Sequence, residues 1–240
     1  MSRYTVQAGW NSVPHLSEQD KADLMSSLSP HQVKARSEGV PSLGAGAIYP
    51  VPEEDIVVDP FQIPDWWARV YGLDVGWKKT AAIWGALDRD TDTLYLNSEH
   101  YSGMAEVAVH AKSIKMRGAW IPGVIDTAAR GRSQTDGKSL FGLYEDEGLI
   151  LNNADKAVEA GIMAMLDRLS TGRLKVFSTL QNWLAEYRLY RRDEKGRIVK
   201  ENDHLMDATR YLNMGLHHAI TRPVDRSSMP TMPGDMTTGY

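Results

Sequence analysis

Hydrophobic and polar positions follow one pattern before residue 66 and a different one after it. The first 65 residues show no sustained period, and repeated prolines interrupt regular structure there. These prolines are Pro14, Pro30, Pro41, Pro50, Pro52, Pro60 and Pro64. One short helix is predicted, from Glu18 to Leu28, with Ser17 as its N-cap. We therefore interpret residues 1–65 as a linker or lead-in segment from a larger protein.

From residue 66 onward, apolar residues recur at the spacing of strands and helices. The first three predicted strands have short connections, which favours an antiparallel meander; they span residues 67–74, 80–87 and 93–101. Helices and strands then alternate, with helices at 104–117, 138–147, 154–169, 180–190 and 203–220 and strands at 120–125, 149–151 and 174–177. This order predicts an α/β domain over residues 66–220, whose mixed sheet has five strands or slightly more and is flanked by helices. Residues 221–240 are rich in Pro, Ser, Thr and Gly and are predicted to form a disordered tail.

The composition narrows the class of protein. The net charge is -4 and the pI is about 6.0, so a DNA-binding surface would have to be a local basic patch. A carboxylate cluster that holds metal ions would make the net charge more negative, as observed. The chain has no cysteine, which excludes disulfides, thiolate zinc sites and cysteine nucleophiles. It also lacks the long apolar run of a membrane span and the apolar stretch of a signal peptide, so we expect an intracellular protein.

Three aspartates lie at positions where metal-binding carboxylates are expected. Asp74 and Asp126 each end an apolar strand, and Asp207 lies in the last predicted helix. Burying a lone carboxylate is costly, and three together repel one another unless a divalent cation neutralises them. Oxygen ligands of this kind suit Mg²⁺ or Mn²⁺. The alternatives are a turn or cap role for the strand-end residues and a surface charge for Asp207.

The segments around these aspartates are Tyr71–Gly76, Gly123–Asp126 and Asn202–Tyr211, the last with the pattern Asp-His-x-x-Asp-Ala-x-Arg-Tyr. The chain resembles the nuclease domains of large terminases of tailed phages and herpesviruses, within the ribonuclease-H-like superfamily. Residues 39–50 resemble the segment that joins motor and nuclease in such proteins. The last pattern is the most specific of these matches.

This resemblance implies a metal-dependent endonuclease that cleaves concatemeric double-stranded viral DNA during genome packaging. It implies that Asp74, Asp126 and Asp207 are both the catalytic residues and the ligands of two Mg²⁺ or Mn²⁺ ions. The implied partners are double-stranded DNA, a portal protein, a small terminase subunit and the ATPase domain of the full-length protein. The implied location is the host cytoplasm.

The roles of two residues near Asp207 in the chain stay open between a functional and a structural alternative. Asp203 and His204 lie four and three residues before it, so each shares a helix face with it. Asp203 is either a metal ligand or the N-cap of the helix. His204 either contacts metal or scissile phosphate, or makes a structural hydrogen bond. Arg210 is interpreted as a packing or salt-bridge residue.

Basic residues for phosphate contact occur in three places. Lys78 and Lys79 follow Asp74, and the loop after Asp126 carries Arg130, Arg132 and Lys138. A charged hairpin near Gly196 carries Arg191, Arg192 and Arg197. The alternative for the loop and the hairpin is a solvated surface with mixed charges.

Gly131–Ser139 looks like a phosphate-binding P-loop, but five residues separate its glycines where the motif requires four. We therefore predict no ATP-binding residues in this chain. Two other functions stay open: a junction resolvase or RNA–DNA hybrid nuclease on the same fold, and a non-catalytic module that docks on a portal or packaging motor.

Overall fold

A computed structural model describes residues 17, 19–21, 46–130, 139–193 and 195–223 of the chain. Its centre is a seven-stranded sheet with the order β1-β7-β4-β3-β2-β5-β6. The strands are β1 (Val57–Val58), β2 (Ala68–Asp74), β3 (Thr80–Asp88), β4 (Thr93–Ser102), β5 (Gly123–Ile125), β6 (Leu151–Asn153) and β7 (Leu174–Phe177). The predicted α/β class is confirmed, and the sheet is two strands larger than the smallest predicted size.

The three strands β2, β3 and β4 form the predicted antiparallel meander. The other strands join it in parallel: β5 pairs with β2, β6 with β5, β7 with β4, and β1 with β7. Strand β1 was not predicted, because it is two residues long and lies in the proline-rich lead-in. Parallel pairing requires helical crossovers between the strands, and these crossovers supply the helices that cover the sheet.

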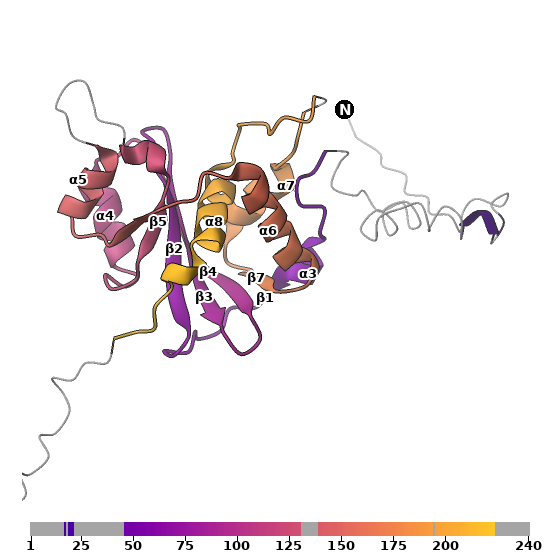
Figure 1. Ribbon diagram of the computed structural model, residues 1–240, viewed down its shortest axis with the longest axis horizontal. Coiled ribbons are helices and arrows are strands. Elements are labelled where there is room, and N and C mark those ends of the chain that lie inside the picture. The colour runs from indigo at the N-terminus through magenta and orange to yellow at the C-terminus, as the bar shows by residue number, and fades with distance from the viewer. Residues whose placement is uncertain (1–16, 18, 22–45, 131–138, 194, 224–240) are drawn as a thin grey trace, which may run out of the picture.

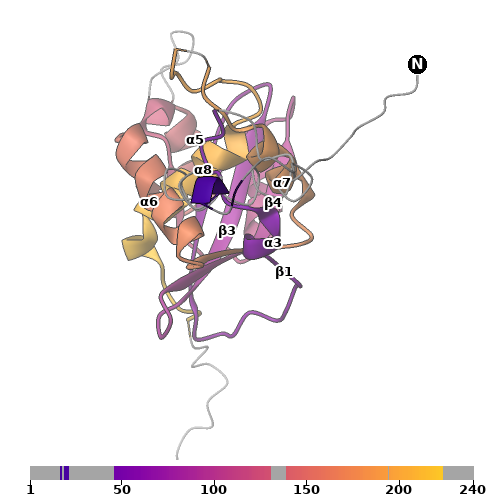
Figure 2. The same ribbon diagram turned by 90° about the vertical axis from the view of Figure 1, so that its right-hand side faces the viewer.

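The helices cover both faces of the sheet (Figure 1). They are α3 (Glu53–Ile56), α4 (Val107–Lys115), α5 (Leu140–Asp146), α6 (Val158–Ser170), α7 (Gln181–Leu189) and α8 (His204–Met214), with the 3-10 turns η2 (Thr127–Arg130) and η3 (Leu216–His218). Helices α4 and α5 lie on one face, over Tyr71 and Trp84. Helices α6, α7 and α8 lie on the other (Figure 2), where Trp183 and Leu212 are fully buried.

Several predicted boundaries differ from the structure. The strand predicted over residues 120–125 begins only at Gly123, and the helix predicted over residues 203–220 stops at Met214. Gly215 is the C-cap of that helix, and it packs so close to β5 that a Cβ there would lie 2.5 Å from Val124 Cγ2. Among the described residues, no helix is long and apolar enough to cross a membrane. At the predicted N-terminal helix, Ser17 Oγ accepts a hydrogen bond from the Asp20 N–H at 3.1 Å, as an N-cap does; most of the rest of that helix lies outside the described residues.

The end of the lead-in packs into the same core as the rest of the chain. Tyr49 and Ile56 are buried, and the Tyr187 hydroxyl donates to the carbonyl of Val51 at 2.8 Å. The structured unit therefore begins before residue 66. The interpretation of residues 1–65 as a motor linker, and the tail beyond residue 223, stay predictions.

Candidate active site

The register of two parallel strands brings the two strand-end aspartates together. Leu73 of β2 is paired with Ile125 of β5, so Asp74 and Asp126 occupy the next positions at the same edge of the sheet. Paired strands lie about 4.8 Å apart, so the two backbones are adjacent there. Asp126 Oδ1 accepts a hydrogen bond from the N–H of Ala128 at 3.1 Å, which starts the turn η2.

Helix α8 crosses β2 at unusually short range because residue 72 is glycine. A Cβ at Gly72 would lie only 1.8 Å from the carbonyl oxygen of Ala208. This approach places Asp207, one residue before Ala208, over the end of β2. The Trp183 indole N–H donates to Thr209 Oγ1 at 2.8 Å and anchors the same helix to α7.

The first turn of α8 is capped from another helix. Asp203 occupies the N-cap position, but its side chain makes no capping hydrogen bond. Glu186 of α7 caps the helix instead, because its Oε2 accepts from the N–H of Leu205 at 2.6 Å and of Met206 at 3.4 Å. Burial raises the pKa of Glu186, and the Tyr101 hydroxyl and these N–H groups partly offset that rise. Sequence reasoning missed Glu186, because its partner is 19 residues away.

His204 contacts the first of the three aspartates. Its Nδ1 lies 2.8 Å from Asp74 Oδ2. This hydrogen bond raises the pKa of His204 above its ordinary value. Burial raises the pKa of Asp74, and the contact with His204 offsets only part of the rise, while Asp207 and Asp203 add to it. The structure therefore supports the hydrogen-bonding alternative for His204, with Asp74 as its partner.

Asp207 is held by two cationic side chains. Lys200 Nζ lies 3.0 Å from its Oδ2, and Arg210 Nη2 lies 2.9 Å from its Oδ1. Lys200 Nζ is also 3.0 Å from Asp203 Oδ2, so one ammonium bridges two carboxylates. Burial lowers the pKa of Lys200, but the two carboxylates outweigh it and the net shift is upward. The salt-bridge interpretation of Arg210 is confirmed.

The three aspartates share one neighbourhood without pointing at one centre. Burial raises the pKa of Tyr211, and the charges of Asp207, Asp74 and Asp126 raise it further, so all three lie near that ring. Within the described part of the chain, no three His, Asp or Glu side chains form a group that could hold a metal ion. Asp74 Oδ2 instead contacts His204, and the two carboxylate oxygens of Asp207 contact Lys200 and Arg210. Their assignment as metal ligands, like that of Asp126, stays a prediction.

The first group of residues predicted to contact phosphate lies beside the candidate active site. Lys78 and Lys79 lie in the turn after β2, at the same end as Asp74, and Lys79 Nζ sits 4.1 Å from the Tyr101 ring centroid. Next to them Trp77 is 70% exposed, and its carbonyl accepts from the N–H of Met104 at 2.9 Å. Trp77 was not singled out from the sequence, because exposure cannot be read from a single aromatic residue.

The charged hairpin is largely paired with itself and with α6. Arg192 binds Glu159 at 2.6 Å, and Arg197 binds Asp193 at 2.9 Å. No described ion pair involves Arg191, which is exposed. Arg132 and Lys138 lie outside the described residues, as does the side chain of Arg130. Their role in DNA contact stays a prediction, and so does that of the hairpin.

Comparison with known proteins agrees with this architecture. The family model described as "Terminase RNaseH-like domain" matches residues 71–215. The large terminase subunit of Salmonella phage P22 is 34% identical over 212 residues, which cover 82% of this chain and 41% of that protein. The chain therefore spans less than half the length of this relative.

Solved structures of nuclease domains share the fold. The nuclease domain of the P22 large terminase superposes with a TM-score of 0.69 at 32% identity, over 75% of this chain and 97% of that one. The large terminase nuclease domain of bacteriophage SPP1, described with bound Mn, gives a TM-score of 0.51 at 19% identity, over 67% of this chain and 96% of that one. The second likeness shows the fold alone.

Proposed function

Because the chain belongs to the terminase RNaseH-like domain family, we propose that it is a metal-dependent endonuclease that cuts concatemeric double-stranded DNA during viral genome packaging. One observation carries the proposal. The β2–β5 register and the contact of α8 with Gly72 bring Asp74, Asp126 and Asp207 to one end of the sheet. The described relatives are terminase large subunits and their nuclease domains, which supports the same reaction class.

The chemistry of the three carboxylates suits a hard divalent cation, although their side chains are not gathered into a group that could hold one in this structure. Asp74 is largely buried, its pKa is raised by burial, and the nearby charges of Asp207 and Asp203 raise it further. A Mg²⁺ or Mn²⁺ ion relieves this kind of repulsion and prefers carboxylate oxygens. Asp74, Asp126 and Asp207 would hold two such ions, with Asp203 and His204 within reach. When bound, the ions would activate a water molecule and stabilise the departing 3′ oxygen.

The protein's own groups prepare these ligands. His204 holds Asp74 through its 2.8 Å contact and so restricts the carboxylate to one orientation. Lys200 Nζ and Arg210 Nη2 hold the two carboxylate oxygens of Asp207, at 3.0 and 2.9 Å. A metal ligand must be deprotonated, and the contact with His204 favours that form because it lowers the pKa of Asp74 against the effect of burial. Lys200 must leave Asp207 Oδ2 for that oxygen to coordinate an ion.

The turn after β2 would contact the DNA. Exposed Lys78 lies four residues past Asp74 and can neutralise a backbone phosphate, and exposed Trp77 and Met104 offer an apolar surface beside it. We extend the proposal to the partners expected of a full-length terminase, namely a portal protein, a small subunit and its own ATPase domain. The place of action is the host cytoplasm.

The test is cleavage of a plasmid by the purified chain with Mg²⁺, with Mn²⁺ or with EDTA. Asp126→Asn and Asp74→Asn are expected to abolish cutting and leave the fold intact. Asp90→Asn is the matched control, because Asp90 is exposed at the opposite end of the sheet. Metal-independent cutting, or full activity of both active-site variants, would refute the proposal.

Two additional arms separate the competing functions. A four-way junction and an RNA–DNA hybrid, each in competition with duplex DNA, test for a resolvase or hybrid nuclease, since the fold alone cannot separate these. Calorimetry with Mn²⁺ tests for the docking module. Metal binding without cutting would mean that the motor domain is needed, whereas indifference to metal would favour the docking module.

A further inference from the structure

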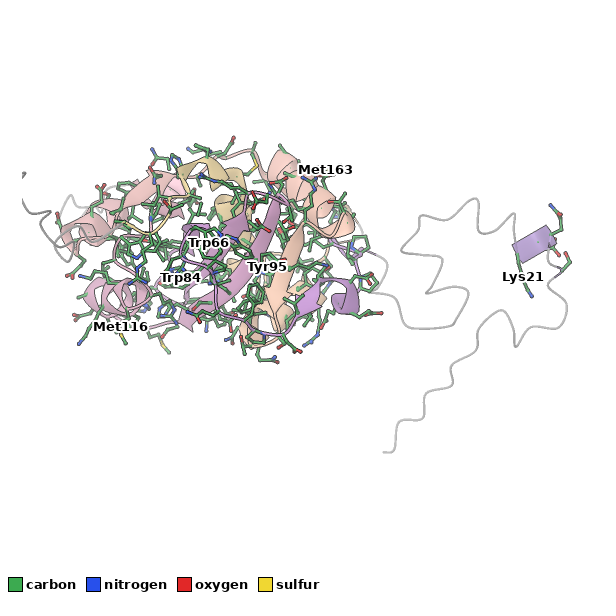
Figure 3. The ribbon with its side chains drawn as sticks, turned by 90° about the horizontal axis from the view of Figure 1, so that it is seen from below. Lys21, Trp66, Trp84, Tyr95, Met116 and Met163 are labelled. Carbon is green, nitrogen blue, oxygen red and sulfur yellow. The ribbon has the colours of Figure 1, made fainter. Side chains whose placement is uncertain are left out.

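A cavity of about 170 Å³ lies away from the three aspartates. Its lining residues are Arg69, Trp84, Gly85, Asn97, Ser98, Arg117 and Ile121. Trp84 belongs to the core between the sheet and the α4–α5 layer (Figure 3). Arg69 precedes Asp74 by five residues in β2, which corresponds to about 17 Å along a strand. The cavity is therefore separate from the candidate active site.

A β-bulge lies in the wall of this cavity. Trp84 is paired with Ser98 while Gly85 is paired with Leu96, so Asn97 is an extra residue in β4. A bulge of this kind interrupts the ladder and redirects side chains out of their regular alternation. It allows Asn97 and its neighbour Ser98 both to line the cavity.

Three of the residues that line the cavity each have a buried polar atom without a hydrogen-bond partner in the described part of the protein. Arg69 Nε, Trp84 Nε1 and Asn97 Oδ1 are buried, and none of them makes a hydrogen bond within the described part of the protein. Trp84 as a whole is only 3% exposed. Buried polar groups in proteins are nearly always hydrogen-bonded, because an unmet donor is costly. Two of the three atoms are donors, and the Asn97 amide can turn to present its N–H₂ group as a third.

The cavity also carries positive charge, and the Glu99 carboxylate compensates that of Arg117 only in part. The Arg117 guanidinium lies 4.7 Å from the Trp84 ring centroid. It donates to three neutral oxygens, namely Ser98 Oγ at 2.9 Å and the carbonyls of Ser113 and Glu99, both at 2.8 Å. No described salt bridge pairs it with a carboxylate, and none of the described residues that line the cavity is acidic. An anion bound in the cavity would balance this positive charge.

Arg69 is only weakly neutralised. Its one described carboxylate partner is the exposed Asp65, at 3.4 Å, which also pairs with Arg222 at 3.3 Å. Burial lowers the pKa of Arg69 and of Arg117, as expected for guanidinium groups that lack a close counter-charge. An oxyanion in the cavity would meet the free N–H donors and both guanidinium charges at once.

We propose that this cavity is a binding site for a phosphate-class oxyanion, held by Arg69, Arg117 and the Trp84 indole N–H. The same chemistry is offered by free inorganic phosphate and by the terminal phosphate of a nucleic-acid end. The proposal does not depend on nuclease activity, so the Asp126→Asn chain, which we expect to be inactive, can be used throughout.

The test is a titration followed through the indole N–H signals of ¹⁵N-labelled protein, at constant ionic strength. Inorganic phosphate is one probe, and a short duplex with or without a 5′-phosphate is the other, with chloride as the control anion. One of the seven tryptophan signals is expected to shift with phosphate, and that signal should be missing from the Trp84→Phe spectrum. A shift caused only by the phosphorylated duplex would identify the nucleic-acid end as the ligand.

Arg117→Gln tests the charge at a residue that is exposed as a whole and does not belong to the buried core. We expect phosphate binding to weaken by about tenfold or more, since a charge-assisted hydrogen bond is lost. Arg188→Gln, an exposed arginine paired with Glu53, is the matched control and should bind like the parent. The proposal is wrong if no indole signal responds to inorganic phosphate or to the phosphorylated duplex beyond the chloride response, or if Arg117→Gln binds the active probe as tightly as the parent.

Discussion

The imidazole Nδ1 of His204, in the first turn of α8, lies 2.8 Å from Oδ2 of Asp74 at the end of β2. These residues are 130 positions apart in the chain. The contact joins the two elements that carry the proposed metal ligands Asp207 and Asp74. It makes His204 a positioning residue for the site, and the effects of changing it can be separated from those of changing a ligand.

His204→Asn should lower DNA cleavage by about tenfold to a hundredfold, the usual cost of losing a partner that orients a metal ligand. The fold should stay intact, because His204 is partly exposed. The measurements are cleavage rate and Mn²⁺ affinity by calorimetry, with His217→Asn as the control in the exposed turn η3. Unchanged rate and unchanged affinity would show that the contact with Asp74 is incidental.

Lys200→Gln should tighten metal binding by several fold. The Lys200 ammonium lies 3.0 Å from both Asp203 and Asp207 and so competes with an ion for these oxygens. Removing the charge leaves Asp207 with Arg210 as its cationic partner. Half-maximal activity should then need less Mn²⁺, whereas Lys195→Gln in the exposed hairpin should have no effect. A weaker Mn²⁺ affinity would instead indicate that Lys200 organises the ligands.

Gly72→Ala should destabilise the protein by about 3 kcal/mol or more, measured by urea unfolding. The added methyl would lie 1.8 Å from the backbone oxygen of Ala208, which cannot move without shifting α8. Gly142→Ala is the control, because its methyl would meet only the Ser139 side chain, at 3.3 Å in a helix. Its stability should stay the same or rise slightly, since alanine favours helices. Equal stability of Gly72→Ala and the parent would contradict the close crossing.

Trp77→Ala should weaken binding to duplex DNA by about fivefold to tenfold, because an apolar contact beside the phosphate-binding Lys78 is lost. Binding is measured by fluorescence anisotropy in the Asp126→Asn background, where no cutting occurs. Trp66→Ala is the matched control: Trp66 is 74% exposed, but it precedes β2 and so lies at the opposite end of the strand from Asp74. If both variants lose the same affinity, the turn after β2 is not a specific DNA contact.

The stability of the domain should fall on acidification in a way that depends on His100. Its Nε2 lies 2.9 Å from His110 Nδ1, and burial together with that neighbour lowers the pKa of His100 to about 4. The unfolded chain titrates near pH 6.5, so it binds the proton first as the pH falls. The stabilising contribution is therefore complete above pH 6.5 and is lost between about pH 6.5 and 4.

Because His100 is partly exposed, we expect this loss to be on the order of 1 kcal/mol. His100→Gln should flatten the dependence of unfolding free energy on pH in that window, relative to the parent. Arg117, whose charge also lowers the pKa of His100, must be kept in both proteins. Parallel pH profiles of parent and variant would show that the pair does not titrate as the structure indicates.

Much of the fold could be predicted because it depends on local patterns. Apolar runs with short connections determined the meander, and the runs ending in Asp74 and Asp126 marked the carboxyl ends of two strands. Parallel pairing then brings such ends to one edge of a sheet whatever the loops between them do. Helix periodicity likewise placed Asp207 in the closing helix.

What the tertiary structure alone decided concerns contacts between residues distant in the chain. Examples are the capping of α8 by Glu186, the pairing of His204 with Asp74, and the β-bulge at Asn97. No local period encodes these, because they depend on strand register and on how closely α8 approaches Gly72. The sequence by itself therefore determined which carboxylates lie at the end of the sheet, and packing decided which cations and donors surround them.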